Sequence, residues 1–142
     1  MAGKSIYDVF KTDEQAENEG AWFNYGPGPS GHDQKFLLAR AGRSNKKYTK
    51  ALQRMQERYG KQIESGTLAD ETAYELLLKV FCTTVLLDWT GICGQDGVEL
   101  PYSTETAIAL MRELPDLYAE LQAHAGSREH FRRVSNEEIA GN

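Results

Sequence analysis

Histidine and cysteine are the residues of this 142-residue chain whose types could support nucleophilic, acid–base or metal chemistry. His32, His124 and His130 do not share a helical spacing of three or four residues, and no H-E-x-x-H zinc motif is present. We therefore expect surface histidines. Cys82 lies in the most apolar stretch, where burial raises the pKa of a thiol, and Cys93 has no basic neighbour in the sequence. Both are expected to be free thiols without a catalytic role.

Two further stretches contain groups typical of ligand sites. Gly26–Gly31 is rich in glycine, as phosphate-binding loops are, but no Lys-Ser or Lys-Thr pair follows it and its prolines remove backbone donors. Asp88, Asp96 and Glu99 lack the ordered spacing of a calcium loop. The sequence thus predicts no catalytic residue, no cofactor and no metal ion, and a protein that is not an enzyme. An enzyme that acts through Cys93 or these acidic residues is the weakest alternative.

The charge of the chain is segregated along the sequence. Between Lys35 and Lys61 there are nine basic residues and one acidic residue, a charge of +8. Because the whole chain carries −5, the other residues together carry −13. A basic middle between acidic ends favours contact between the two kinds of surface, within one chain or between copies. Self-association is therefore one expectation.

The first part of the chain predicts a short helix and a β-hairpin. Thr12 followed three residues later by Gln15 has the form of a capping box, and Gly20 suits the end of a helix over about 13–19. Apolar and aromatic residues on either side of the Gly/Pro loop indicate two antiparallel strands within about 21–41. A two-stranded ribbon is marginal in water, so one of its faces must pack on helices.

The remainder of the sequence predicts a bundle of about four helices over 44–126. Ser44, Thr67 and Ser103 are the expected N-caps, and Pro115 suits the first turn of the last helix. The second helix, over about 68–89, contains the apolar run Leu76–Leu87 and is expected to form the centre of the core. The fold class is therefore mostly helical α+β, with one domain over residues 1–127 and a flexible tail over 128–142.

The first bundle helix combines an apolar stripe with a cationic surface. Its apolar residues recur at steps of four, three and four, at Tyr48, Leu52, Met55 and Tyr59. Its basic residues fall mostly off that stripe and are expected to face solvent or a partner: Lys46, Lys47, Lys50, Arg54 and Arg58. Trp22 and Tyr25 are expected to help bind a protein partner, because exposed aromatic side chains often anchor interfaces.

Two classes of location and partner are disfavoured. The run Leu76–Leu87 is shorter than the roughly 20 residues that a bilayer needs, and Met1–Phe10 lacks the features of a secretory signal. We therefore expect a cytoplasmic protein without a membrane partner. Nucleic acid is also disfavoured, because the chain as a whole is acidic and contains no helix-turn-helix or zinc pattern.

Several segments resemble a family of small proteins from tailed phages that are described as tail assembly chaperones. Near the start these segments are Ile6–Glu17 and Gly20–Gly26, in which an aromatic strand precedes a Gly/Pro loop, followed by Arg40-Ala41-Gly42 and Ser44–Tyr48. Near the end they are Leu114–Tyr118, Leu121-Gln122-Ala123 and Phe131.

The resemblance implies a helical protein without catalytic activity that acts in the host cytoplasm while the tail is built. Its implied partners are the tape measure protein and the tail tube protein. The same family has no active-site pattern to transfer. A rival interpretation of the basic helix is a small phage-encoded regulator or inhibitor that binds a host protein or a nucleic-acid complex.

Overall fold

A computed structural model describes residues 3–132 and has the predicted α+β class. In chain order the elements are helices α1 (Ile6–Phe10) and α2 (Glu14–Glu19), strands β1 (Ala21–Pro27) and β2 (Asp33–Leu38), helices α3 (Lys46–Ser65) and α4 (Asp70–Thr84), strand β3 (Leu86–Thr90), helices α5 (Thr104–Glu113) and α6 (Pro115–Gly126), and the 3-10 turn η1 (Arg128–Phe131).

The sheet has one strand more than the predicted hairpin. Its strand order is β1-β2-β3, and both neighbouring pairs are antiparallel. The predicted helix over 68–89 is wrong after Thr84, because the chain turns at Val85 and continues as β3. Leu86–Thr90 is a short apolar run, and such a run has no periodicity that separates a strand from the end of a buried helix.

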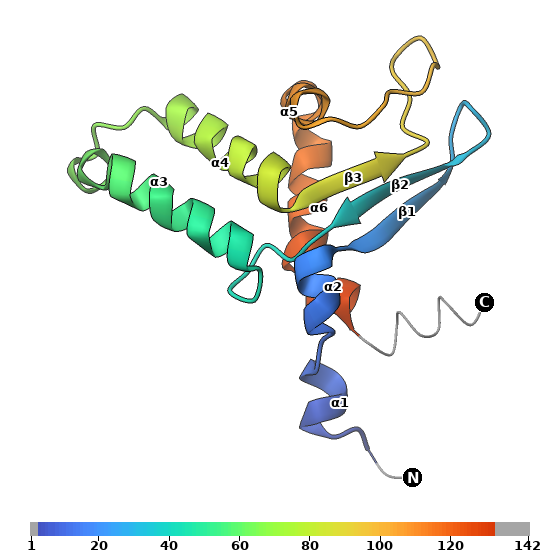
Figure 1. The fold of residues 1–142 in the computed structure, drawn as a ribbon, viewed down its shortest axis with the longest axis horizontal. Helices are drawn as coiled ribbons and strands as arrows, with labels where there is room; N and C mark the ends of the chain where they lie inside the picture. Colours follow the sequence, from blue (N-terminus) through green and yellow to red (C-terminus); the bar gives the residue numbers. More distant parts are fainter. Residues whose placement is uncertain (1–2, 133–142) are drawn as a thin grey trace.

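The core lies between one face of the sheet and helices α4, α5 and α6. Leu38 of β2, Leu78 of α4, Met111 of α5 and Leu121 of α6 are fully buried and belong to one cluster. The expectation that Leu76–Leu87 supplies the centre of the core is confirmed, and its buried apolar members are Leu78, Phe81, Cys82, Val85 and Leu86. α6 passes behind the strands, and the opposite face of the sheet is turned to the viewer (Figure 1).

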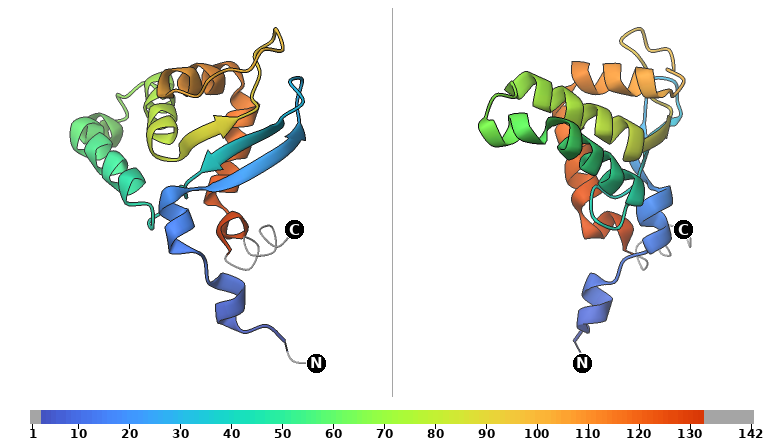
Figure 2. Two further views of the ribbon diagram at one scale, coloured as in Figure 1. Left: turned by 45° about the vertical axis from the view of Figure 1, so that its right-hand side comes forward. Right: turned by 60° about the vertical axis from the view of Figure 1, so that its left-hand side comes forward.

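Helices α3 and α4 form a hairpin that projects from one side of this core (Figures 1 and 2). The structure describes all of α3, and none of its residues is buried. Tyr48, Leu52, Met55 and Tyr59 are half-buried, as their spacing predicts. The hairpin is joined to the core through Asn45, whose buried side-chain amide donates to the carbonyl oxygens of Arg40 and Thr84.

Three predicted caps are corrected by one or two positions. Asp13, rather than Thr12, accepts from the first backbone amides of α2, and Asn45, rather than Ser44, accepts from the amide of Tyr48. Helix α4 begins after Ala69, so Thr67 does not cap it. Ser103 caps α5 and Pro115 begins α6, as predicted.

The predicted tail starts too early. Arg128–Phe131 forms η1, and the side chain of Phe131 is fully buried. The carbonyl oxygen of Phe131 accepts a hydrogen bond from the backbone amide of Asp13 at 2.7 Å, so the last described turn joins the start of α2. The rest of the predicted tail, residues 133–142, lies outside the described residues.

Candidate protein-binding surface

The face of the sheet opposite the core carries three large apolar side chains beside the polar residues Asn24, Lys35, Asp88 and Thr90. Alternate residues of a strand point to opposite faces, so Phe23, Phe36 and Trp89 face the core while Trp22 and its partner Leu37 face outward. Leu87 lies beside Leu37, because a Cβ atom at Gly20 would meet both side chains. We call Trp22, Leu37 and Leu87 the outer sheet face. Trp22 is 44% exposed, so a large apolar side chain here meets solvent.

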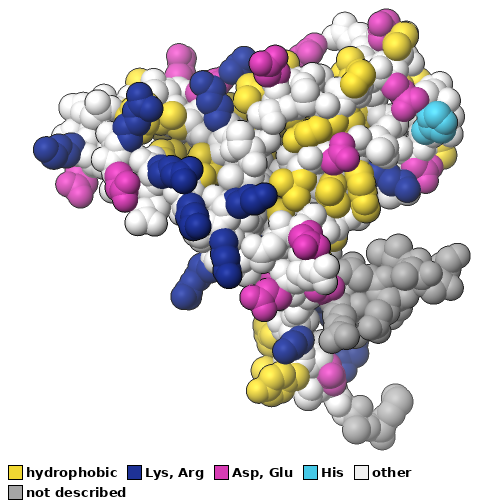
Figure 3. Space-filling view, in the orientation of Figure 1, with side chains coloured by type: hydrophobic (Ala, Val, Ile, Leu, Met, Phe, Trp, Pro, Cys, Tyr) yellow, Lys and Arg dark blue, Asp and Glu magenta, His cyan; other side chains and the backbone are white. Residues whose placement is uncertain are grey.

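The predicted cationic surface lies along α3. All five predicted residues, Lys46, Lys47, Lys50, Arg54 and Arg58, are exposed, and none makes an ion pair with a residue in the range 3–132. We call these five the α3 cations. In Figure 3 Lys and Arg side chains follow α3, and hydrophobic side chains gather over the sheet on the same face of the molecule. The α3 cations and the outer sheet face are therefore available to one partner.

Tyr25 lies on the other face of β1 from Trp22. Its ring packs edge-on against Phe23 and Phe36, with centroid distances of 5.0 and 5.9 Å. Its hydroxyl donates to Glu120 Oε2 at 2.7 Å. Burial, followed by the hydrogen bond to Glu120, raises the pKa of Tyr25 far above its usual value. The structure thus separates the two aromatic residues that the sequence grouped.

Tyr25 instead borders a groove between the sheet and the α5–α6 corner. The groove has a volume of about 350 Å³. Its apolar walls, which we call the apolar groove, consist of Tyr25, Phe36, Ile92, Leu110, Leu114 and Leu117. Strands β1 and β2, the loop after β3 and the α5–α6 corner supply these residues, so no local spacing in the sequence points to the groove.

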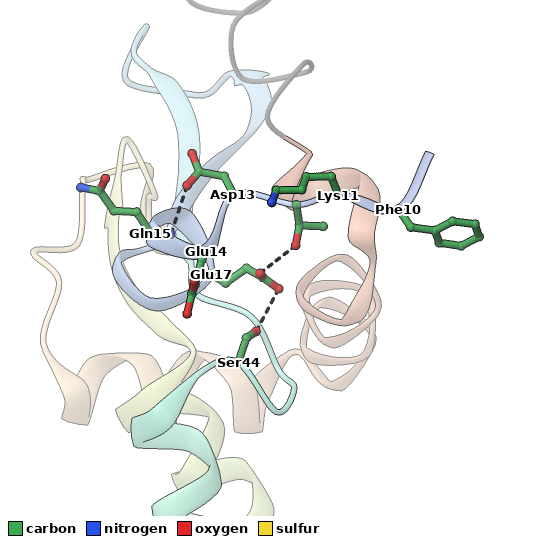
Figure 4. Close-up of a pocket in the computed structure, with 8 residues that line it drawn as sticks. Phe10, Lys11, Asp13, Glu14, Gln15, Glu17 and Ser44 are labelled. Atoms are coloured by element: carbon green, nitrogen blue, oxygen red, sulfur yellow. Dashed lines mark hydrogen bonds between the residues drawn. The ribbon is translucent and has the colours of Figure 1, made fainter. Parts of the chain in front are cut away.

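A larger hollow of about 650 Å³ lies where α1 meets α2 (Figure 4). Its buried group is Glu17, whose Oε1 accepts from the hydroxyl of Thr12 at 2.8 Å. Its Oε2 accepts from Arg40 Nη1 at 2.7 Å and from the hydroxyl of Ser44 at 2.9 Å. Burial raises the pKa of Glu17, but these hydrogen bonds and the charge of Arg40 outweigh it and lower the pKa below its usual value. The carboxylate therefore holds α2 against the segment before α3.

The thiols and histidines are distributed over separate parts of the fold. Cys82 is fully buried, and burial raises its pKa to about 12, whereas Cys93 is partly exposed. His32 is exposed, as expected, with Nδ1 2.9 Å from Glu99 Oε2. The other two histidines were expected at the surface but are half-buried. The ring of His124 stacks on that of Phe23 with a centroid distance of 3.8 Å, and His130 Nε2 lies 2.8 Å from the carbonyl oxygen of Ala21.

One exposed apolar element escaped the sequence analysis. α1 places Ile6, Tyr7 and Phe10 on the surface with exposed fractions of 73%, 77% and 55%. The spacing of Ile6 and Phe10, four residues apart after the Ser5–Asp8 capping box, is the signal that would have found this helix.

Comparison with known proteins gives a family and no closer relative. No curated protein and no solved structure matches the chain. Among residues 3–132, no helix is long and apolar enough to cross a membrane. A family model described as "YdaY prophage protein" matches residues 43–142, well over half of the chain. This match agrees with the phage origin that the resemblance implied, and its description says nothing of tail assembly. The chain belongs to the YdaY prophage protein family.

Proposed function

We propose that this protein is a non-enzymatic tail assembly chaperone that binds the tape measure protein, the tail tube protein or both in the host cytoplasm. The observation that supports the proposal is the pairing of an apolar outer sheet face with the α3 cations on one side of the molecule. A client helix with an apolar stripe and acidic borders matches this pairing in both respects.

The mechanism is reversible coverage. Trp22, Leu37 and Leu87 shield the apolar stripe of the client from water, which provides most of the binding free energy. The α3 cations attract its acidic borders, which speeds encounter and sets orientation. Because the surface is open rather than an enclosed pocket, the client can leave as it is handed to the growing tail.

The test is co-expression with a tape measure fragment. Wild-type protein should keep the fragment soluble and co-purify with it, and Trp22→Ala should weaken the complex about 30-fold, the loss typical of an aromatic interface anchor. Val98→Ala is the matched control, since Val98 is 62% exposed but lies on the loop after β3. The proposal is contradicted if the tape measure fragment stays insoluble and does not co-purify when it is co-expressed with the wild-type protein.

The alternative function is regulation through the α3 cations, favoured by their exposure and by the absence of ion-pair partners for them in the part of the chain that the structure describes. If all five contact phosphates of duplex DNA, the logarithm of the binding constant should fall with the logarithm of salt concentration with a slope of about −4.5. Lys50→Glu with Arg54→Glu should then abolish DNA binding.

The same titration separates the two functions. A complex with an apolar client should persist as salt rises, because burial of apolar area is not screened. A steep salt dependence for DNA together with failure to hold the tape measure fragment would favour the regulator.

A further inference from the structure

We propose that α1 of one copy of this protein docks in the apolar groove of a second copy. The proposal concerns a different surface from the outer sheet face and goes beyond the chaperone function. It rests on three features: the exposed apolar side chains of α1, an open apolar groove with an acidic rim, and a short connection that keeps α1 away from the groove of its own chain.

The donor is the segment Lys4–Lys11, which we call the N-terminal arm. Its helix is only five residues long, and helices this short are unstable in water without tertiary packing. Its side chains nevertheless remain largely exposed, with 73% of Ile6, 77% of Tyr7 and 55% of Phe10 accessible. The ring of Phe10 points away from the Glu17 hollow (Figure 4).

Within residues 3–132, the contacts of the arm with the rest of the domain include a cation–π contact and a hydrogen bond from two arginines. The guanidinium of Arg128 lies 4.7 Å from the centre of the Phe10 ring, and Arg132 Nη2 donates to the carbonyl oxygen of Asp8 at 3.2 Å. These contacts orient the arm but leave its apolar side chains uncovered. Among residues 3–132, no surface covers them.

The acceptor is the apolar groove at the α5–α6 corner. Its volume of about 350 Å³ is in the range of pockets that hold small ligands, and Leu114 on its wall is 45% exposed. The groove is thus both apolar and open to a second molecule.

Charge favours the arm as the occupant. Glu113 and Asp116 flank Leu114 in the sequence and are exposed, and Glu120 lies within hydrogen-bond distance of Tyr25 on the groove wall. The arm carries a lysine on each side of its helix, at Lys4 and Lys11. Its single acidic residue, Asp8, accepts the capping hydrogen bond from Ser5. A cationic apolar arm thus meets an acidic apolar groove.

The arm cannot occupy the groove of its own chain. Only Lys11 and Thr12 separate α1 from Asp13, which is held by the carbonyl oxygen of Phe131. Tyr25 and Gln34 place the groove toward the Gly/Pro turn of the sheet, whereas α1 lies beyond the end at which β1 begins (Figures 1 and 2). If the arm occupies an apolar groove of this protein, that groove therefore belongs to a second copy. Because donor and acceptor surfaces differ, each added copy exposes a new arm and a new groove, which gives an open chain or a ring.

The experiment is a mixing test by sedimentation velocity with the full-length chain. The arm variant is Ile6→Asp with Phe10→Asp, and the groove variant is Leu114→Lys, which places a cation in the acidic rim. All three side chains are exposed, so the variants should fold. Wild-type protein should form dimers and larger species as concentration rises. Each variant alone should associate at least about tenfold more weakly, the loss expected when an interface anchor is removed.

Mixing the two variants should restore one contact, because the arm variant retains an intact groove and the groove variant retains an intact arm. The product should be a 1:1 dimer that does not grow further. Tyr74→Asp, at an exposed aromatic residue of α4, is the matched control and should associate like wild type.

Three results would overturn the proposal: a monomeric wild-type protein, variants that self-associate as wild type does, or a mixture that stays monomeric. If wild type remains monomeric and the arm variant fails to co-purify with a tape measure fragment in the co-expression assay, the arm binds the client rather than a second copy. The mixing test contains no client, so its failure leaves the proposed chaperone function intact.

Discussion

Glu17→Gln is expected to lower the free energy of unfolding by about 3 kcal/mol, near the lower end of the range for breaking a buried ion pair. The side chain of Glu17 is 6% exposed, and its carboxylate accepts hydrogen bonds from Thr12, Arg40 and Ser44. The amide of glutamine has one acceptor oxygen in place of two, and it leaves the half-buried Arg40 without its counter-charge. Urea denaturation at neutral pH measures the change.

The pH dependence of this effect has a defined sign. The pKa of Glu17 is lower in the folded protein than its ordinary value of 4.5, so its ionised form stabilises the fold above that pH. The contribution is lost as the pH falls through the lowered pKa, and the difference between wild type and Glu17→Gln should shrink there. Glu14→Gln, at an exposed position of the same helix, should change stability by less than about 0.5 kcal/mol. Equal effects at Glu14 and Glu17 would contradict the assignment.

Gly91→Ala should destabilise the protein by about 3 kcal/mol or more, because backbone strain adds to a steric clash. Gly91 is buried and has a φ of +70°, a conformation that residues with a Cβ atom rarely adopt. A Cβ atom here would collide with the carbonyl oxygen of Asp33, at the start of β2. Because the atoms in the way belong to the backbone of Asp33 and Gln34, relieving the clash would require β2 to move away from the loop after β3.

Gly66→Ala separates the two contributions. Gly66 also has a φ of +70°, but no atom lies within 4 Å of the position that its Cβ would take. Its substitution should cost only about 1 kcal/mol, the effect of the backbone conformation alone. Thermal unfolding followed by circular dichroism compares the two variants. If Gly91→Ala lowers the free energy of unfolding by no more than Gly66→Ala does, the predicted clash with Asp33 does not contribute to stability.

Local patterns predicted those parts of the fold that depend on neighbours in the sequence. The stripe of Tyr48, Leu52, Met55 and Tyr59 lies against α4, and the α3 cations are exposed, because both follow from helical periodicity. The strand pair and the cap at Ser103 also follow from local signals, namely glycine-rich turns and a short polar side chain before a helix.

The remaining features depend on contacts between distant segments. β3 forms because Leu86–Thr90 pairs with the free edge of β2. The local sequence of Leu86–Thr90 contains no information about that edge, so the strand could not be predicted from it. Phe131 is buried because α2 and α6 leave room for η1, although its neighbours in the sequence are polar. The apolar groove likewise exists only once the sheet and the α5–α6 corner have met.

Part of the candidate site could have been predicted better from the sequence. Trp22 and Tyr25 are three positions apart in a strand, and an odd separation places two side chains on opposite faces. The alternation rule alone would have assigned Tyr25 to the core side with Phe23. The pairing of Trp22 with Leu37 required the register of the hairpin, which its irregular Gly/Pro turn does not specify.

The projecting α3–α4 hairpin has a consequence for the local energetics of the protein. Since no residue of α3 is buried and Tyr48 is its one contact with the core cluster among the described residues, opening of this helix exposes little of the core, and its free energy lies below that of global unfolding. The backbone amides of α3 therefore exchange with solvent deuterium sooner than those of β2 or α6. A partner that binds α3 would slow this exchange, so the exchange rate of the α3 amides measures whether a partner is bound.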